Sequence, residues 1–233
     1  MRIALLGYGK MGKSIEIIAL ERKHTISLKI ESSTSNFDFS NTDVAIDFSL
    51  PSKAVENIKK ALDANIAVIS GTTGWLNDYD EIIDYCKTKN GTFLYASNFS
   101  LGVNIFFEIN LKLSQLMANL DGYSTEIEEI HHKQKLDAPS GTAITLANQI
   151  IEHTNYKDWT LDEPKANEVQ IEAKRIENFP GTHEVSYKSD IDTISIKHTA
   201  HSRKGFALGA VIAAEWIKDK KGVFTMKDVL NIG

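Results

Sequence analysis

Residues 131–143 read HHKQKLDAPSGTA and place two histidines, two lysines and an aspartate directly ahead of a predicted helix. The helix is indicated by the amphipathic pattern of residues 143–151, and Ser140 stands just before it. The unpaired N–H groups of its first turn would face the same turn as the histidines. A helix N-terminus, the Lys135 ammonium and two imidazoles together make a strong site for carboxylates.

The same residues also have a plainer interpretation. His131 and His132 can be surface residues at the end of a strand, and residues 137–140 can be a signal that stops one element and starts the next. A metal site is disfavoured, because Glu128 and Glu129 lie on the preceding strand and no third ligand follows at a reliable spacing. We therefore expect no metal, while the anion site and the plain surface both stay open.

A second candidate site lies near the start of the chain, where residues 7–12 read GYGKMG. This GxGxxG string falls between a predicted strand and a predicted helix, where glycines permit a tight turn and close approach of the backbone to a pyrophosphate. Glu31 ends the next strand, where a carboxylate would accept hydrogen bonds from an adenosine ribose. The alternative is a tight turn with a surface glutamate. The candidate cofactor contacts are Gly7, Gly9, Lys10, Met11, Gly12 and Glu31.

Two further turns follow predicted parallel strands directly. Residues 70–74 read SGTTG and residues 97–100 read SNFS. Open α/β sheets bind ligands at the carboxyl ends of their strands, so these turns could enclose the nicotinamide half of a dinucleotide, although GTTG alone can be only a turn. The candidate residues are Gly71, Thr72, Thr73, Ser97, Asn98, Phe99 and Ser100.

The elements that would position these residues alternate in the first hundred positions. Strands are predicted at 2–6, 25–30, 44–48, 67–70 and 92–95, and helices at 13–23, 51–64 and 78–89. This alternation is typical of βαβ units on a Rossmann-type, doubly wound parallel sheet.

From about residue 101 the pattern changes to a helix through 115 and then strand-like text. The predicted strands are 125–132, 169–175, 183–189 and 192–199. We expect a second, α+β domain with a largely antiparallel sheet. The last predicted helix, 207–218, could pack back on the first domain. The predicted domains are 1–101 with 205–233, and 102–204.

Bulk properties exclude several classes. A net charge of −5 over 233 residues argues against a nucleic-acid partner. Any anionic ligand must therefore be bound by positive or N–H groups within its own site. The start is apolar only over residues 3–6, and no stretch is long enough to span a membrane, which favours a cytoplasmic protein. The only cysteine, Cys86, permits neither an internal disulfide nor a cysteine-cluster metal site.

The segment His131-His132-x-x-Lys135-x-Asp137-Ala138-Pro139-Ser140-Gly141-Thr142-Ala143 resembles the signature of the dihydrodipicolinate reductase family of lysine and diaminopimelate synthesis. The resemblance extends in order along the chain. It includes Asp47-Phe48-Ser49, Gly71-Thr72-Thr73-Gly74, Asn98-Phe99-Ser100-x-Gly102-Val103-Asn104, Gly181-x-His183 and His201-Ser202-Arg203. The glycine loop is one residue shorter than is usual in the family, and Glu177 stands where many members have glycine.

This resemblance implies a Rossmann domain for NADH or NADPH and a second domain that binds substrate and builds a homotetramer. The implied reaction is reduction of a cyclic, unsaturated dicarboxylate imine. His131 would be the proton donor or acceptor, Lys135 a second proton donor, and His132, Gly141 and Thr142 the contacts to the substrate carboxylates. Two bound carboxylates raise the pKa of a nearby His or Lys, so we expect the site to keep its acid charged.

Cofactor choice and assembly can also be predicted. Glu31 repels a 2′-phosphate and Ser32 adds no cation, although Lys10 could, so we expect NADH to be used at least as well as NADPH. The strands of residues 125–199 should leave a sheet whose apolar face and edges one small domain cannot cover, which favours a homotetramer.

Two other functions fit parts of the sequence. Another two-domain NAD(P)-dependent dehydrogenase of amino or hydroxy acids would share residues 1–100 but would not need the 131–143 segment. A non-catalytic dinucleotide sensor would bind the cofactor without turnover.

Overall fold

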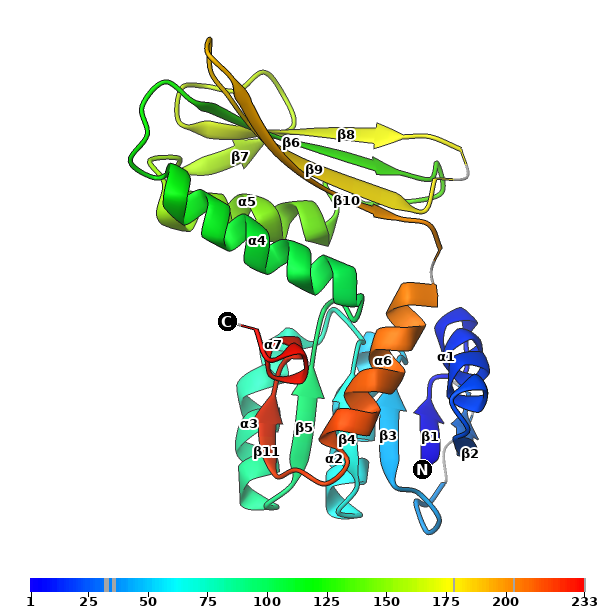
Figure 1. Cartoon of the computed structure of the whole chain (residues 1–233). Helices are drawn as coiled ribbons and strands as arrows, with labels where there is room; N and C mark the ends of the chain where they lie inside the picture. The colour runs from blue at the N-terminus through cyan, green and yellow to red at the C-terminus, as the bar shows by residue number, and fades with distance from the viewer. Residues whose placement is uncertain (32–33, 35–36, 178, 203, 233) are drawn as a thin grey trace. The chain divides into compact units, whose positions relative to one another are not determined.

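The computed structural model describes all residues except 32, 33, 35, 36, 178, 203 and 233. Ser32 and Arg203, which entered the predictions above, therefore lie outside the described residues. The chain forms two compact units (Figure 1). Unit 1 contains residues 1–101 and 204–233, and unit 2 contains residues 102–203.

Unit 1 is built on a single parallel sheet. Its strands are β1 (Arg2–Leu6), β2 (Thr25–Ile30), β3 (Val44–Asp47), β4 (Ala67–Ser70), β5 (Thr92–Tyr95) and β11 (Gly222–Phe224). Their order is β11-β5-β4-β3-β1-β2, and every pairing is parallel. Its helices are α1 (Lys10–Glu21), α2 (Pro51–Asp63), the 3-10 turn η1 (Leu76–Asp78), α3 (Tyr79–Thr88), α6 (Lys204–Ile217) and α7 (Met226–Leu230). The prediction of a Rossmann-type doubly wound sheet is confirmed.

Helices cover both faces of this sheet. α1 and α6 pack on one face through side chains such as Ile15 and Val211, while α2 and α3 pack on the other through Ile58 and Ile82. Strands β3 and β4 are consequently buried at every residue. Burial on both faces explains why these strands are short, almost continuous apolar runs rather than alternating ones.

Unit 2 combines one sheet with two helices. Its strands are β6 (Ser124–His131), β7 (Asp158–Thr160), β8 (Glu168–Arg175), β9 (Gly181–Lys188) and β10 (Thr193–Ala200), and its helices are α4 (Leu101–Met117) and α5 (Gly141–His153). The strand order is β10-β9-β6-β8-β7. Strand β9 is antiparallel to β10 and β6, whereas β6, β8 and β7 pair in parallel. The prediction of a largely antiparallel sheet is wrong on this side, because α5 returns the chain to the starting end of β6 before β7 and β8 begin.

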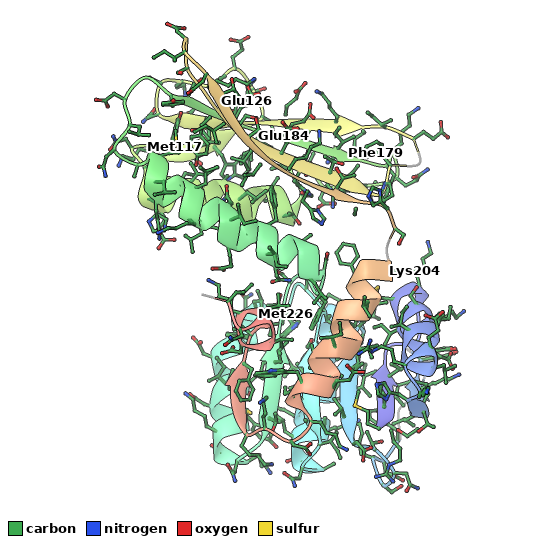
Figure 2. All side chains as sticks on the ribbon, viewed as in Figure 1. Met117, Glu126, Phe179, Glu184, Lys204 and Met226 are labelled. Atoms are coloured by element: carbon green, nitrogen blue, oxygen red, sulfur yellow. The ribbon has the colours of Figure 1, made fainter. Side chains whose placement is uncertain are left out.

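The two faces of this sheet differ in chemistry. On one face Ile127, Val185 and Tyr187 form a core with α4 and α5. The opposite face, which includes Glu126 and Glu184 (both labelled in Figure 2), carries ion pairs between Glu and Lys on neighbouring strands. These pairs are Glu126–Lys188, Glu128–Lys174 and Glu184–Lys197. The expectation of an uncovered apolar face is therefore wrong, since α4 and α5 cover that face and the other face is polar. The part of the argument that concerns the sheet edges, and the tetramer itself, stay predictions.

None of the helices that the structure describes combines the length and the apolar character that a membrane span requires.

Candidate active site

The glycine loop follows β1 in a conformation that only glycine tolerates. Gly7 has φ of +101°, and a Cβ there would lie 2.1 Å from the carbonyl oxygen of Phe48. A Cβ at Gly12 would lie 2.3 Å from the carbonyl oxygen of Gly7. Gly9 precedes the first turn of α1, and a Cβ there would meet no atom within 4 Å. The loop therefore packs tightly against the segment after β3 at Gly7 and against itself at Gly12, and it leaves open space at the N-terminus of α1.

A cavity of about 540 Å³ lies beside this loop in unit 1. Its lining includes Gly7, Gly9, Glu31, Phe48, Ser49 and Lys53. Lys10 and Met11 begin α1 but do not line the cavity. The lysine in the wall is Lys53, whose Nζ lies 3.0 Å from Oε2 of Glu56.

In the loops after β4 and β5, some side chains that were predicted to contact the cofactor point into the interior of unit 1. The Thr72 side chain is buried and its hydroxyl donates to Asp47 at 2.7 Å. The Phe99 ring is buried in the core at 5.6 Å from the ring of Phe48. Thr73 and Ser97 are exposed. The side chains of Thr72 and Phe99 thus pack in the interior of unit 1, so only the backbone of these residues can contact a ligand.

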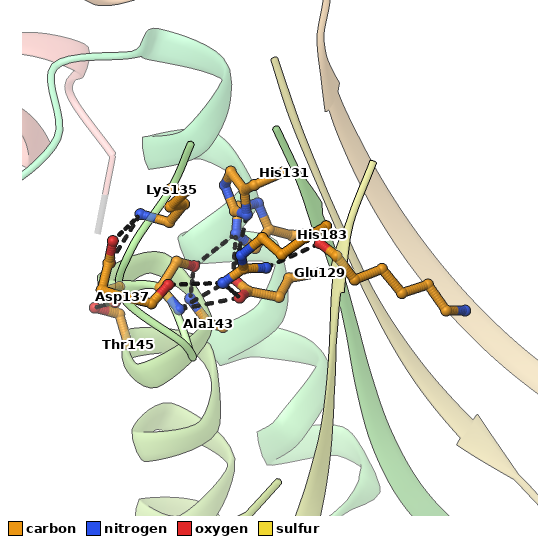
Figure 3. Close-up of polar contacts among 11 residues, drawn as sticks. Glu129, His131, Lys135, Asp137, Ala143, Thr145 and His183 are labelled. Carbon is orange, nitrogen blue, oxygen red and sulfur yellow. Dashed lines mark hydrogen bonds and ion pairs between the residues drawn. The ribbon is translucent and has the colours of Figure 1, made fainter. Parts of the chain in front are cut away.

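A buried carboxylate, Glu129, lies near the end of β6 in unit 2 and has an exposed fraction of 0% (Figure 3). Its Oε1 accepts a hydrogen bond from Arg175 Nη2 at 3.0 Å, and its Oε2 accepts one from the Ser140 N–H at 3.1 Å. His131 Nδ1 lies 3.4 Å and His183 Nε2 lies 3.6 Å from Oε2. Two imidazoles and a guanidinium thus share one carboxylate.

Strand register produces this cluster. Glu129 and His131 are two residues apart on β6, so both point toward the same face. Glu129 is paired with His183 on β9, and His131 is paired with Arg175 on β8. The sequence predictions missed Glu129, His183 and Arg175 as site residues, and the only signal was the Gly181-x-His183 segment of the family resemblance.

The cluster bears on the expected absence of a metal. Ligand-type atoms of Glu129, His131 and His183 lie within 4.8 Å of one another. The third of these residues, His183, comes from β9 and is brought in by strand pairing, which spacing along the sequence does not reveal. However, the Arg175 guanidinium already forms an ion pair with the Glu129 carboxylate, and His183 Nε2 lies 3.1 Å from the Ser140 hydroxyl. The positive charge of Arg175 at this carboxylate repels a metal cation and so disfavours its binding. The absence of a metal stays a prediction.

The two central groups of the cluster have shifted pKa values. Burial lowers the pKa of His131 to about 4, against the opposing effect of the Glu129 charge. Burial by itself raises the pKa of Glu129, but hydrogen bonds from His183, Ser140 and Arg175 outweigh it and lower the pKa to about 2. At neutral pH His131 is therefore uncharged in the substrate-free site, and the predicted charged acid refers to the site with both carboxylates bound. A positive charge on His131 must come with the bound carboxylates.

The remaining predicted residues lie around the start of α5. Lys135 Nζ contacts both carboxylate oxygens of Asp137, at 2.9 and 2.8 Å. Ser140 caps α5 by accepting a hydrogen bond from the Ala143 N–H at 3.2 Å. Gly141 opens the helix, and a Cβ there would meet no atom within 4 Å. Thr142 follows in this first turn, and the anion site at the start of α5 stays a prediction.

His132 directly follows β6. Its carbonyl oxygen accepts a hydrogen bond from the Lys135 N–H at 3.1 Å, which closes the turn that carries the lysine.

Comparison with known proteins decides the family. Residues 20–99 match the family described as dihydrodipicolinate reductase, N-terminus, and residues 102–230 match dihydrodipicolinate reductase, C-terminus. The chain belongs to the dihydrodipicolinate reductase family. The N-terminal match begins after the glycine loop of residues 7–12.

Curated relatives agree with this assignment. A 4-hydroxy-tetrahydrodipicolinate reductase from Christiangramia forsetii is 58% identical over 234 residues, covering 99% of this chain and 98% of the relative. One from Methanococcoides burtonii is 41% identical over 198 residues, covering 82% of this chain and 74% of the relative. The prediction of a 4-hydroxy-tetrahydrodipicolinate reductase, an NAD(P)H-dependent oxidoreductase of lysine and diaminopimelate biosynthesis, is confirmed by these matches.

Solved structures share the fold. A dipicolinate-bound dihydrodipicolinate reductase from Paenisporosarcina sp. TG-14 matches with a TM-score of 0.76 at 21% identity, covering 97% of both chains. An amine dehydrogenase from Mycobacterium smegmatis matches with a TM-score of 0.64 at 9% identity, covering 96% of this chain and 94% of that one. The two-domain fold is therefore shared well beyond the dihydrodipicolinate reductase family.

Proposed function

We propose that unit 1 binds the nicotinamide cofactor and that unit 2 binds the dicarboxylate imine and protonates the reduced product. The observation that carries this proposal is the buried Glu129 cluster beside the open N-terminus of α5. Fixed cations, imidazoles and free N–H groups suit a substrate that brings two carboxylates and takes up a proton.

The cofactor fits the glycine loop of unit 1. The pyrophosphate would rest on the Gly9 and Lys10 end of α1, where no side chain obstructs it, and Glu31 would accept hydrogen bonds from the ribose. Gly71 to Thr73 and Ser97 to Ser100 would contact the nicotinamide half chiefly through their backbone. When bound, the reduced cofactor supplies the hydride that reduces the imine.

The substrate carboxylates would be held at the start of α5. Lys135 would exchange the Asp137 carboxylate for a substrate carboxylate, with His132 and the first-turn N–H groups of Gly141 and Thr142 as further contacts. Bound carboxylates raise the pKa of His131, and Glu129 stabilises the imidazolium that forms. His131 would then deliver its proton as negative charge develops on the substrate, with Lys135 as a second donor.

Cofactor preference follows from the cavity wall. Glu31 opposes a 2′-phosphate, and the lysine that reaches the wall, Lys53, is already paired with Glu56. We therefore expect NADH to be used at least as well as NADPH. A biosynthetic reductase also needs a supply of reduced cofactor, which favours a location in the cytoplasm.

For assembly we propose a homotetramer that uses the open polar face of the unit 2 sheet. The ion pairs Glu126–Lys188, Glu128–Lys174 and Glu184–Lys197 place charges of both signs on this face, where they can pair with the same groups of a second copy. Light scattering should give four times the chain mass of 25.9 kDa, and a monomer at working concentration would contradict the proposal.

The function is tested by following NADH oxidation with freshly generated product of dihydrodipicolinate synthase. We expect turnover that depends on both the enzyme and that product. Binding of NADH without turnover would favour a sensor, and turnover of an amino or hydroxy acid in place of the imine would favour the other dehydrogenase.

A further inference from the structure

A second buried carboxylate, Asp47, lies at the end of β3 in unit 1 and has no part in the reaction proposed above. Its exposed fraction is 0%. Oδ1 accepts hydrogen bonds from Ser49 Oγ at 2.6 Å and Asn57 Nδ2 at 3.2 Å. Oδ2 accepts hydrogen bonds from Ser70 Oγ at 2.8 Å and Thr72 Oγ1 at 2.7 Å. Four neutral donors from four places in the chain thus converge on one side chain.

The donors also fix the direction of the hydrogen bonds around Asp47. The Ser49 N–H can only donate, and it donates to Thr72 Oγ1 at 2.9 Å, so the Thr72 hydroxyl hydrogen is available for Asp47. The Asn57 amide N–H donates to Ser49 Oγ at 3.1 Å, so the Ser49 hydroxyl hydrogen is likewise available for Asp47. The Ser49 and Thr72 hydroxyls and the Asn57 amide therefore each require an acceptor on Asp47, and two carboxyl oxygens provide it.

This network sets one wall of the cavity beside the glycine loop. Ser49 and Asn57 line the cavity and both donate to Asp47. Phe48, which also lines it, is pressed between the two glycine turns. A Cβ at Gly71 would lie 2.3 Å from the Phe48 ring, and one at Gly7 would lie 2.1 Å from the Phe48 carbonyl oxygen. Hydrogen bonds to the buried Asp47 thus connect the turn after β4, the segment after β3 and helix α2.

We propose that Asp47 is a positioning residue for the dinucleotide site, which holds the Phe48–Ser49 segment and the Gly71–Thr73 turn at the separation that the cofactor requires. The inference rests on the proposed cofactor site in unit 1. Asp47 touches neither cofactor nor substrate in this account, so its loss should raise the KM for NADH and leave kcat at saturation nearly unchanged.

Asp47→Asn is the sharpest variant, because an amide cannot accept at both positions. Its NH₂ group would face the Asn57 amide in one orientation and the Ser70 and Thr72 hydroxyls in the other. We expect the KM for NADH to rise about tenfold or more, equivalent to ~1.4 kcal/mol or more. The KM for the imine and kcat should stay within about threefold of wild type.

A pair of milder variants separates positioning from general loss of stability. Thr72→Ser keeps the hydroxyl that donates to Asp47, whereas Thr72→Val removes it at similar size, so the KM for NADH should be several-fold higher in Thr72→Val than in Thr72→Ser. Thr92→Val is the matched control, since Thr92 is a buried threonine at the opposite end of the sheet whose hydroxyl donates to the Lys220 carbonyl. It should lower the melting temperature without changing the KM for NADH.

The measurements are steady-state kinetics, NADH dissociation by fluorescence and melting temperature on each variant. A wild-type enzyme that fails to bind NADH would overturn the proposed cofactor site. Wild-type binding with unchanged KM values in Asp47→Asn and Thr72→Val would overturn the role of Asp47 alone. If Asp47→Asn does not fold, the Thr72 pair decides, and equal KM values for Thr72→Ser and Thr72→Val would reject the inference.

Discussion

The two buried carboxylates, Asp47 in unit 1 and Glu129 in unit 2, are both fully shielded from solvent yet behave in opposite ways. Asp47 receives hydrogen bonds only from hydroxyl and amide groups, and burial raises its pKa. Burial has the same tendency at Glu129, but the Arg175 guanidinium, the Ser140 N–H and His183 lower its pKa to about 2.

The difference shows how a protein chooses the donors for a buried charge. Neutral donors fix the positions of loops without adding charge, which suits a binding wall such as the one around Asp47. A guanidinium and imidazoles keep a carboxylate ionised even when charged groups nearby bind or titrate. Such donors suit a site that binds a dicarboxylate substrate and transfers a proton to it. The comparison predicts that unit 1 controls cofactor affinity and that unit 2 controls chemistry.

The largest effect should follow from His131→Gln, which removes the titratable partner of Glu129. We expect kcat to fall about a hundredfold or more, within the usual range for losing a general acid. NADH dissociation and the melting temperature at neutral pH should barely change, because the cofactor binds unit 1. His153→Gln, at the end of α5, is the control. A near-normal kcat would leave Lys135 as the only candidate acid.

Lys135→Ala tests the substrate side of the Glu129 cluster. The change removes a charge-assisted hydrogen bond worth roughly 1.5 to 3 kcal/mol together with a proton donor, so KM for the imine and kcat should both suffer. Lys133→Ala, on an exposed lysine two residues earlier, should leave both near wild type. Changes under about threefold in both constants for Lys135→Ala would make it a surface residue.

The free energy of unfolding below neutral pH should depend on pH in opposite ways for the Glu129–His131 cluster and for Asp47. The pKa of His131 is about 4 against an ordinary 6.5, so the unfolded chain binds its proton first and stability is lost as the pH falls between these values. Glu129 acts in the same direction between pH 4.5 and about 2. Asp47, with its raised pKa, acts in the opposite direction, because the folded chain binds its proton first.

Urea unfolding at pH 7 and pH 4 measures this contrast. The wild type should lose on the order of 2 kcal/mol more of unfolding free energy than His131→Gln over that interval. The control His153→Gln should follow the wild type. Equal losses for wild type and His131→Gln would mean that His131 is not held neutral by the fold.

The smallest effect concerns Glu31, which belongs to unit 1 alone. Glu31→Ala should raise the kcat/KM for NADPH relative to NADH by less than about tenfold, because an exposed carboxylate acts through screened repulsion. Glu21→Ala, at the far end of α1, provides the comparison. A wild-type enzyme with a strong preference for NADPH would contradict the role given to Glu31.

Much of unit 1 could be predicted from the sequence, because each of its signals is local. Buried strands such as Val44–Asp47 are apolar runs, and the glycines at positions 7 and 12 are required by the turn itself. The three-residue strands β7 and β11 were missed because so short a segment shows no periodicity. Loop side chains were also misjudged, since no local signal tells that Thr72 points down to Asp47.

The site in unit 2 was only half predictable. His131, Lys135 and the start of α5 lie within one continuous segment, and their spacing is visible in the sequence. Glu129 and its partners are not, because Arg175 lies 46 residues away and meets Glu129 only through the parallel pairing of β6 and β8. The sequence predicted only a largely antiparallel sheet, so this parallel pairing was not foreseen, and neither was the burial that lowers the pKa of His131.

The most direct test of the account is a full kinetic analysis of Asp47→Asn beside Glu129→Gln, with NADH and the imine varied together. Asp47→Asn should raise the KM for NADH about tenfold with kcat nearly intact. Glu129→Gln leaves Arg175 without its buried partner, a change that costs about 3 to 5 kcal/mol of stability, so the assay is run well below its melting temperature. There kcat should fall about tenfold or more while NADH dissociation stays at the wild-type value. If Glu129→Gln weakens NADH binding as much as Asp47→Asn does, or if Asp47→Asn lowers kcat as much as Glu129→Gln does, the division of labour between the two carboxylates is wrong.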